Sequence, residues 1–295
     1  MKTISLRIIN GINPSDRFTA DSSFTRMLVR ALKMNNSFYY PFDELESISR
    51  LYAPDSSFRI FTWQLLINDD VVRQHGAIQM KTADGSLKLF RLIDRSDVTS
   101  NLRDTIGNND GWIGAIYYKI IEKQSGNKKY YTLLGFDAGN INSDRKIAEV
   151  LTFNNGEPIF GGHYFRSPDG GIKPQAPASR YIMEYKKDAG PRLSWDPDQD
   201  MIIAEHLISE SGEPAKKWTL IGDGDYEGFK WQDGMWVHVE KVYSYITPQG
   251  KEPVPKPLKD NQGNLIDNKL TDDDEQPATE SKEKPKTIKP KKKNG

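Results

Sequence analysis

Residues 218–243 read WTLIGDGDYEGFKWQDGMWVHVEKVY, and the Asp233-Gly234 pair within them decides how we interpret the chain. An Asp-Gly pair between runs of aromatic and β-branched residues is typical of a two-residue hairpin turn, in which both turn residues take positive φ. Such a turn also fixes the register of the two strands. We therefore expect a β-hairpin in which Trp231 lies opposite Trp236.

One face of this hairpin would be aromatic at one end and acidic at the other. In the same register Phe229 faces His238, and Glu227 faces Glu240. Flat rings beside two carboxylates would suit a sugar or a peptide. The alternative, which we favour, is that the rings form a wall against a neighbouring sheet, because aromatic cross-strand pairs mostly stabilise sheets. The candidate ligand-binding residues are Glu227, Phe229, Trp231, Trp236, His238 and Glu240.

The same turn chemistry recurs along the chain. ADGS at 83–86, SGNK at 125–128 and NNGE at 154–157 each place a glycine-containing turn between strand-like runs. About a dozen short strands would then pair with their sequence neighbours. We expect a mainly β protein, an antiparallel meander closed as a sandwich, a barrel or propeller-like blades.

Both ends of the chain differ from this pattern. Residues 21–36, DSSFTRMLVRALKMNN, carry apolar residues at helical spacing and predict one helix, preceded by an N-terminal arm over 1–20. The helix and the β region would form one domain over 21–246. Residues 247–295 are rich in proline, contain no aromatic residue and carry their charges in blocks, so we expect a disordered tail.

The composition excludes several classes of function. The 41 basic and 41 acidic side chains cancel, which disfavours binding to nucleic acid. The chain has no cysteine, so disulfides, thiolate nucleophiles and iron–sulfur clusters are excluded. We expect no transmembrane segment and no cofactor. Residues 1–10 do not resemble an export signal, so the protein would be cytoplasmic if Met1 is the true start.

Two stretches carry a resemblance to a known group of proteins. Residues 54–63 read PDSSFRIFTW, and residues 133–137, LLGFD, are followed by KIAEVLTF at 146–153. Residues 20–245, which contain these motifs, resemble a family of uncharacterised proteins from Bacteroidota, whose members usually look exported. The resemblance implies a shared fold and a periplasmic or exported location, and it implies no activity.

An acidic run within the hairpin region raises the question of a metal. Asp223, Asp225 and Glu227 alternate with glycine and tyrosine, as oxygen ligands do in calcium loops, and they are the candidate metal ligands. Counted from Asp223, however, the twelfth position is Gly234, where an EF-hand places a bidentate glutamate. A strand-joining turn explains the run better.

No motif of known chemistry appears in the sequence. We find no nucleophile elbow, phosphate-binding glycine loop or dinucleotide fingerprint, and we assign no catalytic residue. We therefore expect a non-catalytic, extracytoplasmic binding or scaffold protein, whose partner could be a carbohydrate or a protein. The alternative is a carbohydrate-active or other hydrolase that uses carboxylates from distant strands, because such pairs leave no local spacing.

Overall fold

A computed structural model describes residues 1–68, 71–167 and 176–243. Within these residues the chain forms two α-helices and fifteen strands arranged in three sheets. Apart from one parallel pair, the ladders between named strands are antiparallel. The prediction of a mainly β, antiparallel protein with a helical N-terminus is confirmed.

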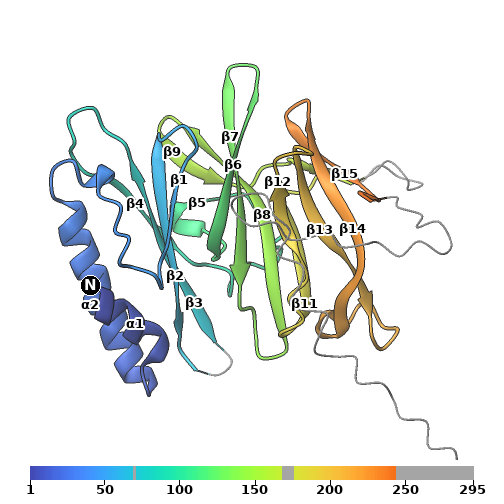
Figure 1. Cartoon of the computed structure of the whole chain (residues 1–295), viewed down its shortest axis with the longest axis horizontal. Coiled ribbons are helices and arrows are strands. Elements are labelled where there is room, and N and C mark those ends of the chain that lie inside the picture. Colours follow the sequence, from blue (N-terminus) through green and yellow to red (C-terminus); the bar gives the residue numbers. More distant parts are fainter. Residues whose placement is uncertain (69–70, 168–175, 244–295) are drawn as a thin grey trace, which may run out of the picture. The chain divides into compact units, whose positions relative to one another are not determined.

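The first sheet carries the helices (Figure 1). Its strands, in spatial order, are β1 (Ser49–Tyr52), β2 (Phe58–Leu66), β3 (Val72–Met80) and β4 (Lys88–Ile93). The helices α1 (Lys2–Asn10) and α2 (Pro14–Leu32) bury their apolar residues against β2. Phe24 on α2 packs edge-on against Trp63, with ring centroids 5.3 Å apart. The Trp63 Nε1 donates a 2.7 Å hydrogen bond to Asp21, so the helix is fixed by polar as well as apolar contacts.

The N-terminal residues differ from the sequence prediction. Residues 1–20 were expected to form an arm, but they contain α1 and the start of α2, and Ile8 is 1% exposed. Helix α2 begins at Pro14 because Asn13 caps it, accepting a 2.9 Å hydrogen bond from the amide of Asp16. It ends at Leu32, whereas the prediction placed the helix over 21–36.

The middle sheet has its apolar residues on both faces. In spatial order its strands are β5 (Gly107–Asn108), β9 (Glu157–Phe160), β8 (Ser143–Asn154), β7 (Lys128–Asp137) and β6 (Ile116–Ser125), and β11 (Arg180–Lys186) also pairs with β8. Leu133 belongs to one buried cluster with Phe58 of the first sheet. Its neighbour Leu134 belongs to another cluster with Trp236 of the third sheet. The middle sheet therefore packs between the other two.

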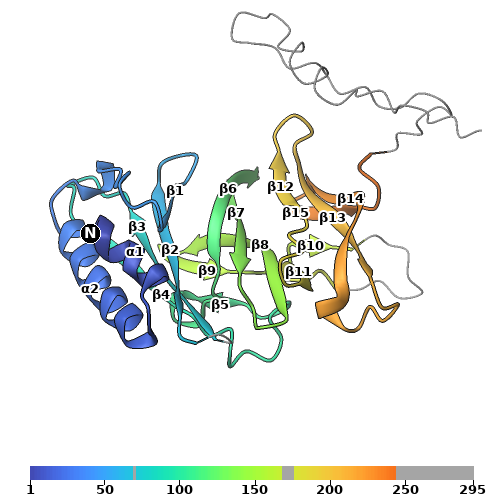
Figure 2. The ribbon, with the colours of Figure 1, turned by 60° about the horizontal axis from the view of Figure 1, so that its bottom comes forward.

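The third sheet contains the predicted hairpin (Figure 2). In spatial order its strands are β10 (Phe165–Arg166), β15 (Met235–Val239), β14 (Leu220–Gln232), β13 (Met201–Ser209) and β12 (Leu193–Asp196). Asp233 and Gly234 have φ of 50° and 81°, as the two-residue turn requires. Trp231 pairs with Trp236, and Phe229 pairs with His238, so these predicted pairs are confirmed.

The mode of closure was left open by the sequence, and the structure shows none of the three closures as such. The three sheets are separate and none closes on itself. Their faces meet through the buried clusters described above. The predicted tail, 247–295, lies outside the described residues.

Candidate functional site

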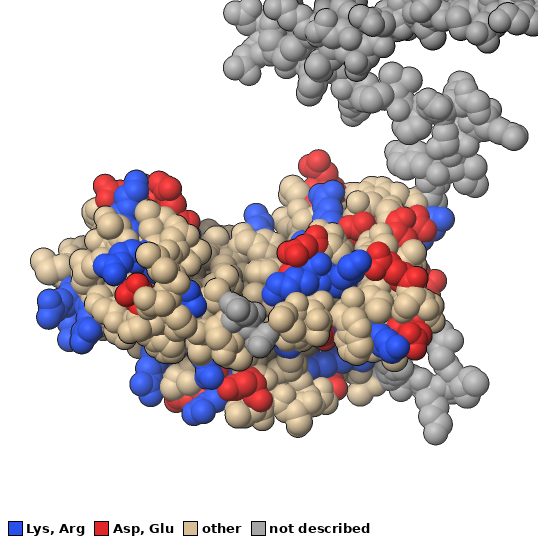
Figure 3. All heavy atoms as spheres, turned by 90° about the horizontal axis from the view of Figure 1, so that it is seen from below, with Lys and Arg blue, Asp and Glu red and all other residues tan. Residues whose placement is uncertain are grey.

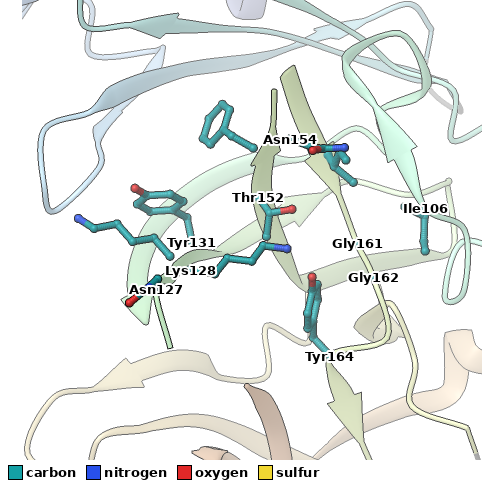
Figure 4. Close-up of a pocket in the computed structure, with 12 residues that line it drawn as sticks. Ile106, Asn127, Lys128, Tyr131, Thr152, Asn154, Gly161, Gly162 and Tyr164 are labelled. Carbon is teal, nitrogen blue, oxygen red and sulfur yellow. The ribbon is translucent and has the colours of Figure 1, made fainter. Parts of the chain in front are cut away.

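A cleft of about 760 Å³ opens where two hairpins of the middle sheet separate (Figure 4). The ladder between β7 and β8 stops at the pair Tyr131–Leu151, although β7 begins at Lys128 and β8 continues to Asn154. Beyond this pair β7 follows β6 and β8 follows β9, so the hairpins diverge. The cleft is lined by Ile106, Asn127, Lys128, Lys129, Tyr131, Thr152, Phe153, Asn154, Ile159, Gly161, Gly162 and Tyr164.

The cleft runs along strand edges and not over the face of a sheet. Thr152, Phe153 and Asn154 are consecutive in β8, and all three line it. Because successive side chains of a strand point to opposite faces, a cavity touches all three only along the strand edge. Edge backbone N–H and C=O groups that no longer meet a neighbouring strand need another partner. The cleft therefore offers backbone groups to a ligand as well as side chains.

Lys128 places a positive charge in the cleft. Its side chain extends toward Thr152 and Tyr164 (Figure 4), and its ammonium lies 5.2 Å from the centre of the Tyr130 ring. Within the described residues no carboxylate lies within 4.0 Å of Lys128. Of the described residues that line the cleft, none is an aspartate or a glutamate. The cleft therefore has a cation that its own wall does not neutralise.

The neighbouring lysine is engaged differently. The Lys129 ammonium contacts Asp55 at 2.7 Å and Glu122 at 2.8 Å, and the hydrogen bonds that it donates to these two carboxylates raise its pKa. Tyr131 donates a 2.8 Å hydrogen bond to the same Asp55. Burial alone would raise the pKa of Asp55, but the hydrogen bonds from Lys129, Ser57 and Tyr131 outweigh it and lower the pKa to about 2. This network fixes one wall of the cleft to the turn before β2.

Tyr164 forms the opposite wall, and two glycines allow it to do so. Gly161 and Gly162 have φ of 85° and 117°, a region that favours glycine. A Cβ atom on Gly162 would lie 2.5 Å from the Tyr164 ring. Burial raises the pKa of Tyr164, an effect that a hydrogen bond with Thr152 partly offsets. The phenol is therefore protonated at neutral pH and can donate to a ligand.

A row of rings connects the cleft to the predicted aromatic face. Tyr164 packs edge-on against Tyr130 with centroids 5.4 Å apart, and Tyr130 lies 5.2 Å from Trp231. Trp231 packs on Trp236 at 5.3 Å. The rings of the hairpin thus contact Tyr164, a wall of the cleft, through Tyr130.

The aromatic residues of the hairpin lie where the wall interpretation placed them. Trp236 is 0% exposed, and its Nε1 donates a 2.8 Å hydrogen bond to Thr132 of the middle sheet. Phe229 is 4% exposed and packs on Tyr181, with centroids 4.8 Å apart. Trp231 is only partly buried. The first two residues are core, so the hairpin rings do not form an exposed aromatic shelf.

The two glutamates of the hairpin do not form the predicted cross-strand pair. Strand β15 ends at Val239, so exposed Glu240 lies beyond the ladder, and Glu227 pairs with Ala204 of β13. Glu227 lies 2.8 Å from Nε2 of His238 and accepts a 2.8 Å hydrogen bond from Tyr181. Burial alone would raise the pKa of Glu227, but the contacts with His238 and Tyr181 outweigh it and lower the pKa.

The candidate metal ligands are spread along strand β14. Asp223 lies 2.7 Å from Nδ1 of His206, a contact that raises the pKa of that histidine. Asp223 also accepts a hydrogen bond from the amide of Asp225. Over the described ranges no group of three or more His, Asp or Glu side chains could hold a metal ion. We therefore do not retain Asp223, Asp225 and Glu227 as a joint metal site.

Sequence reasoning did not identify the cleft. Most of the residues that line it come from two hairpins, the others are Ile106, Gly161, Gly162 and Tyr164, and none belongs to a motif of known chemistry. One signal was present in the sequence. The Gly161-Gly162 pair directly follows the strand after the NNGE turn, and two adjacent glycines indicate a backbone with positive φ.

No protein-family model, curated protein or solved structure matches this chain. In the described part of the chain, neither helix is long and apolar enough to cross a membrane.

Proposed function

We propose that this is a non-catalytic binding protein whose cleft between the β6–β7 and β8–β9 hairpins takes an acidic carbohydrate. The observation that carries the proposal is the ammonium of Lys128, a cation without a carboxylate partner among the described residues, in a cleft lined by amides, hydroxyls and aromatic rings. A location outside the cytoplasm is part of the proposal, and the resemblance to exported proteins from Bacteroidota supports it.

The lining of the cleft suits a sugar. Asn127, Asn154 and Thr152 provide amide and hydroxyl groups for sugar hydroxyls, and Tyr164 adds a phenol. The rings of Phe153 and Tyr164 can pack against the apolar faces of pyranose rings. A volume of about 760 Å³ lies within the range of small-ligand sites.

The negative charge of the ligand follows from local electrostatics. On the face drawn in Figure 3 acidic and basic side chains are interspersed, and the whole chain has zero formal net charge. Attraction for an anion must therefore arise at the cleft itself. Lys128 is the residue placed to pair with a carboxylate or sulfate of the sugar.

The hydrolase alternative would need two carboxylates beside the bound sugar. The described part of the cleft wall contains no carboxylate, and the nearby Asp55 and Glu122 are bound to Lys129 and do not line it. A release assay with reducing-end detection would test this alternative, since turnover of any oligosaccharide that binds would support a hydrolase.

The proposal is tested by calorimetric titration with three matched oligosaccharides. The probes are oligogalacturonate, its neutral galactose counterpart of the same length, and a sulfated galactose oligomer. We expect binding of a charged probe that is roughly tenfold tighter than binding of the neutral one, and weaker with rising salt because the cleft is open to solvent. Equal affinity for all three, or no binding to any, would contradict an acidic carbohydrate as the ligand.

A further inference from the structure

A second strand edge, formed by residues that do not line the cleft, is unpaired on β11 among the described residues. This strand pairs with β8 on one side. The amide of Lys187 donates to Asn142 on that side, whereas the amide of Arg180 donates to Arg103 on the other side. Since backbone groups alternate along a strand, the N–H and C=O groups of Ile182 and Glu184 point away from β8. Among the described residues no strand pairs with this edge.

Two hollows lie along the open edge. One, of about 280 Å³, is at the Arg180 end, and the other, of about 360 Å³, is at the Glu184 end. Tyr181 and Ile182 line both hollows although they belong to opposite faces of the sheet, which places both hollows along the strand edge. The open backbone groups and the hollows therefore form one continuous track.

The opposite wall of the track is rigid. Tyr181 packs on Phe229, and its hydroxyl donates to Glu227, so β11 is fixed to β14 across the two sheets. Phe229 and His238 line the first hollow, and Glu227 lines the second. A segment that binds here would meet preformed side walls and would not have to open them.

The first hollow is basic. Arg103, Arg166 and Arg180 line it, and none of its other described lining residues is an aspartate or a glutamate. Arg180 is bound to Glu149, with both side chains 0% exposed, and its Nη2 has no hydrogen-bond partner within the described residues. Arg103 and Arg166 form no ion pair with any described carboxylate. An acidic group on the bound segment would find guanidinium partners here.

We propose that the open edge of β11 binds an extended peptide segment of a partner protein as an additional strand, with an aspartate or glutamate of the segment in the arginine-lined hollow. Hydrogen bonds to the main-chain groups of Ile182 and Glu184 would supply affinity that does not depend on the sequence of the peptide. The hollows would bind alternate side chains of the peptide and so give specificity. At ~3.3 Å per residue, a segment of about five residues would span both hollows. This interaction is independent of the carbohydrate cleft.

The proposal is tested by selecting peptides from a displayed random heptapeptide library on the full chain. We expect the selected peptides to be enriched in Asp or Glu and to slow amide hydrogen exchange in the peptic fragment that contains Ile182 and Glu184. Ile182→Pro removes the outward N–H, and Arg103→Ala/Arg166→Ala removes the basic walls. Each variant should weaken binding of a selected peptide at least tenfold, whereas Ile182→Val and the helix-surface variant Arg26→Ala should not.

A variant that does not fold can be distinguished from a proposal that is wrong. If Ile182→Pro does not fold, the same selected peptide with one N-methylated backbone amide replaces it as the test of strand addition. Peptides that bind the arginine variant as tightly as wild type would overturn the charge requirement. Peptides whose binding leaves exchange at Ile182 and Glu184 unchanged, or a library that yields no enrichment, would overturn the site.

Discussion

Tyr131 of β7 and Asp55 of the turn before β2 are joined by a 2.8 Å hydrogen bond, and Lys129 contacts the same carboxylate. This connection attaches the β6–β7 hairpin to the first sheet. The β8–β9 hairpin pairs through β9 with β5. Beyond the pair Tyr131–Leu151, β7 keeps its pairing with β6 and β8 its pairing with β9, and the space between the two hairpins is the cleft.

Loss of the Asp55 carboxylate should loosen this wall in a pH-dependent way. The folded pKa of about 2 lies below the ordinary value of 3.8, so the stabilisation is fully present above pH ~4 and is lost as the pH falls through ~2. Asp55→Asn should lower the free energy of unfolding by on the order of 1 kcal/mol at pH 6. Urea melts of wild type and variant between pH 6 and 2 should converge at low pH; a constant difference would contradict the network.

Trp236 should be essential for stability. Its side chain is fully buried between the middle and third sheets, so Trp236→Ala leaves a large cavity and an unpaired Thr132 hydroxyl. We expect a loss of about 3–5 kcal/mol. Thermal melts measure it, and Trp218→Ala is the matched control because Trp218 is 51% exposed. A Trp236→Ala protein as stable as the control would show that the hairpin rings are not core.

Gly162 should be needed for the position of Tyr164. Gly162→Ala combines a strained φ with a Cβ that meets the Tyr164 ring, so it should destabilise the protein by about 1–3 kcal/mol and weaken binding in the cleft. Gly190→Ala separates the two effects, because Gly190 has φ of 60° with no atom within 4 Å of its Cβ position. Equal effects of both substitutions on ligand affinity would argue against Tyr164 as a wall of the cleft.

The two hairpin glutamates should respond differently to alanine. From the sequence alone both were treated as one acidic end, but Glu227 binds Tyr181 and His238 whereas Glu240 is exposed. Glu227→Ala should cost about 1–3 kcal/mol by leaving a buried phenol unpaired, and Glu240→Ala should be neutral. Because the folded pKa of Glu227 is lowered, its stabilisation is present above the ordinary pKa near 4.5 and falls as the pH drops through the folded value. Chemical denaturation at pH 7 and pH 3 would show both effects.

The parts of the fold that could be predicted are those determined locally. Asp233-Gly234 determines its own backbone angles, and these determine the pairing of Trp231 with Trp236. The start of α2 was missed although its signal is also local, since Asn13 and Pro14 together form a capped helix start.

The cleft could not be predicted in the same way. Its position depends on where the β7–β8 ladder ends, and beside that end Lys129 contacts Asp55, which is 74 residues away in the chain. Glu227 shows the same limit, because its partner Tyr181 comes from a strand of another sheet. Turn chemistry specifies neighbours along the chain and carries no information about such contacts.

The most direct test of the proposed function compares Lys128→Gln with Lys230→Gln in titrations with the acidic oligosaccharide that wild type binds most tightly. Lys230 is an exposed lysine of β14 that does not line the cleft, so the two variants have the same net charge. We predict that Lys128→Gln weakens binding about tenfold or more and removes much of its salt dependence, while Lys230→Gln binds as wild type does. Equal affinities for the two variants would contradict the assignment of the cleft as the binding site.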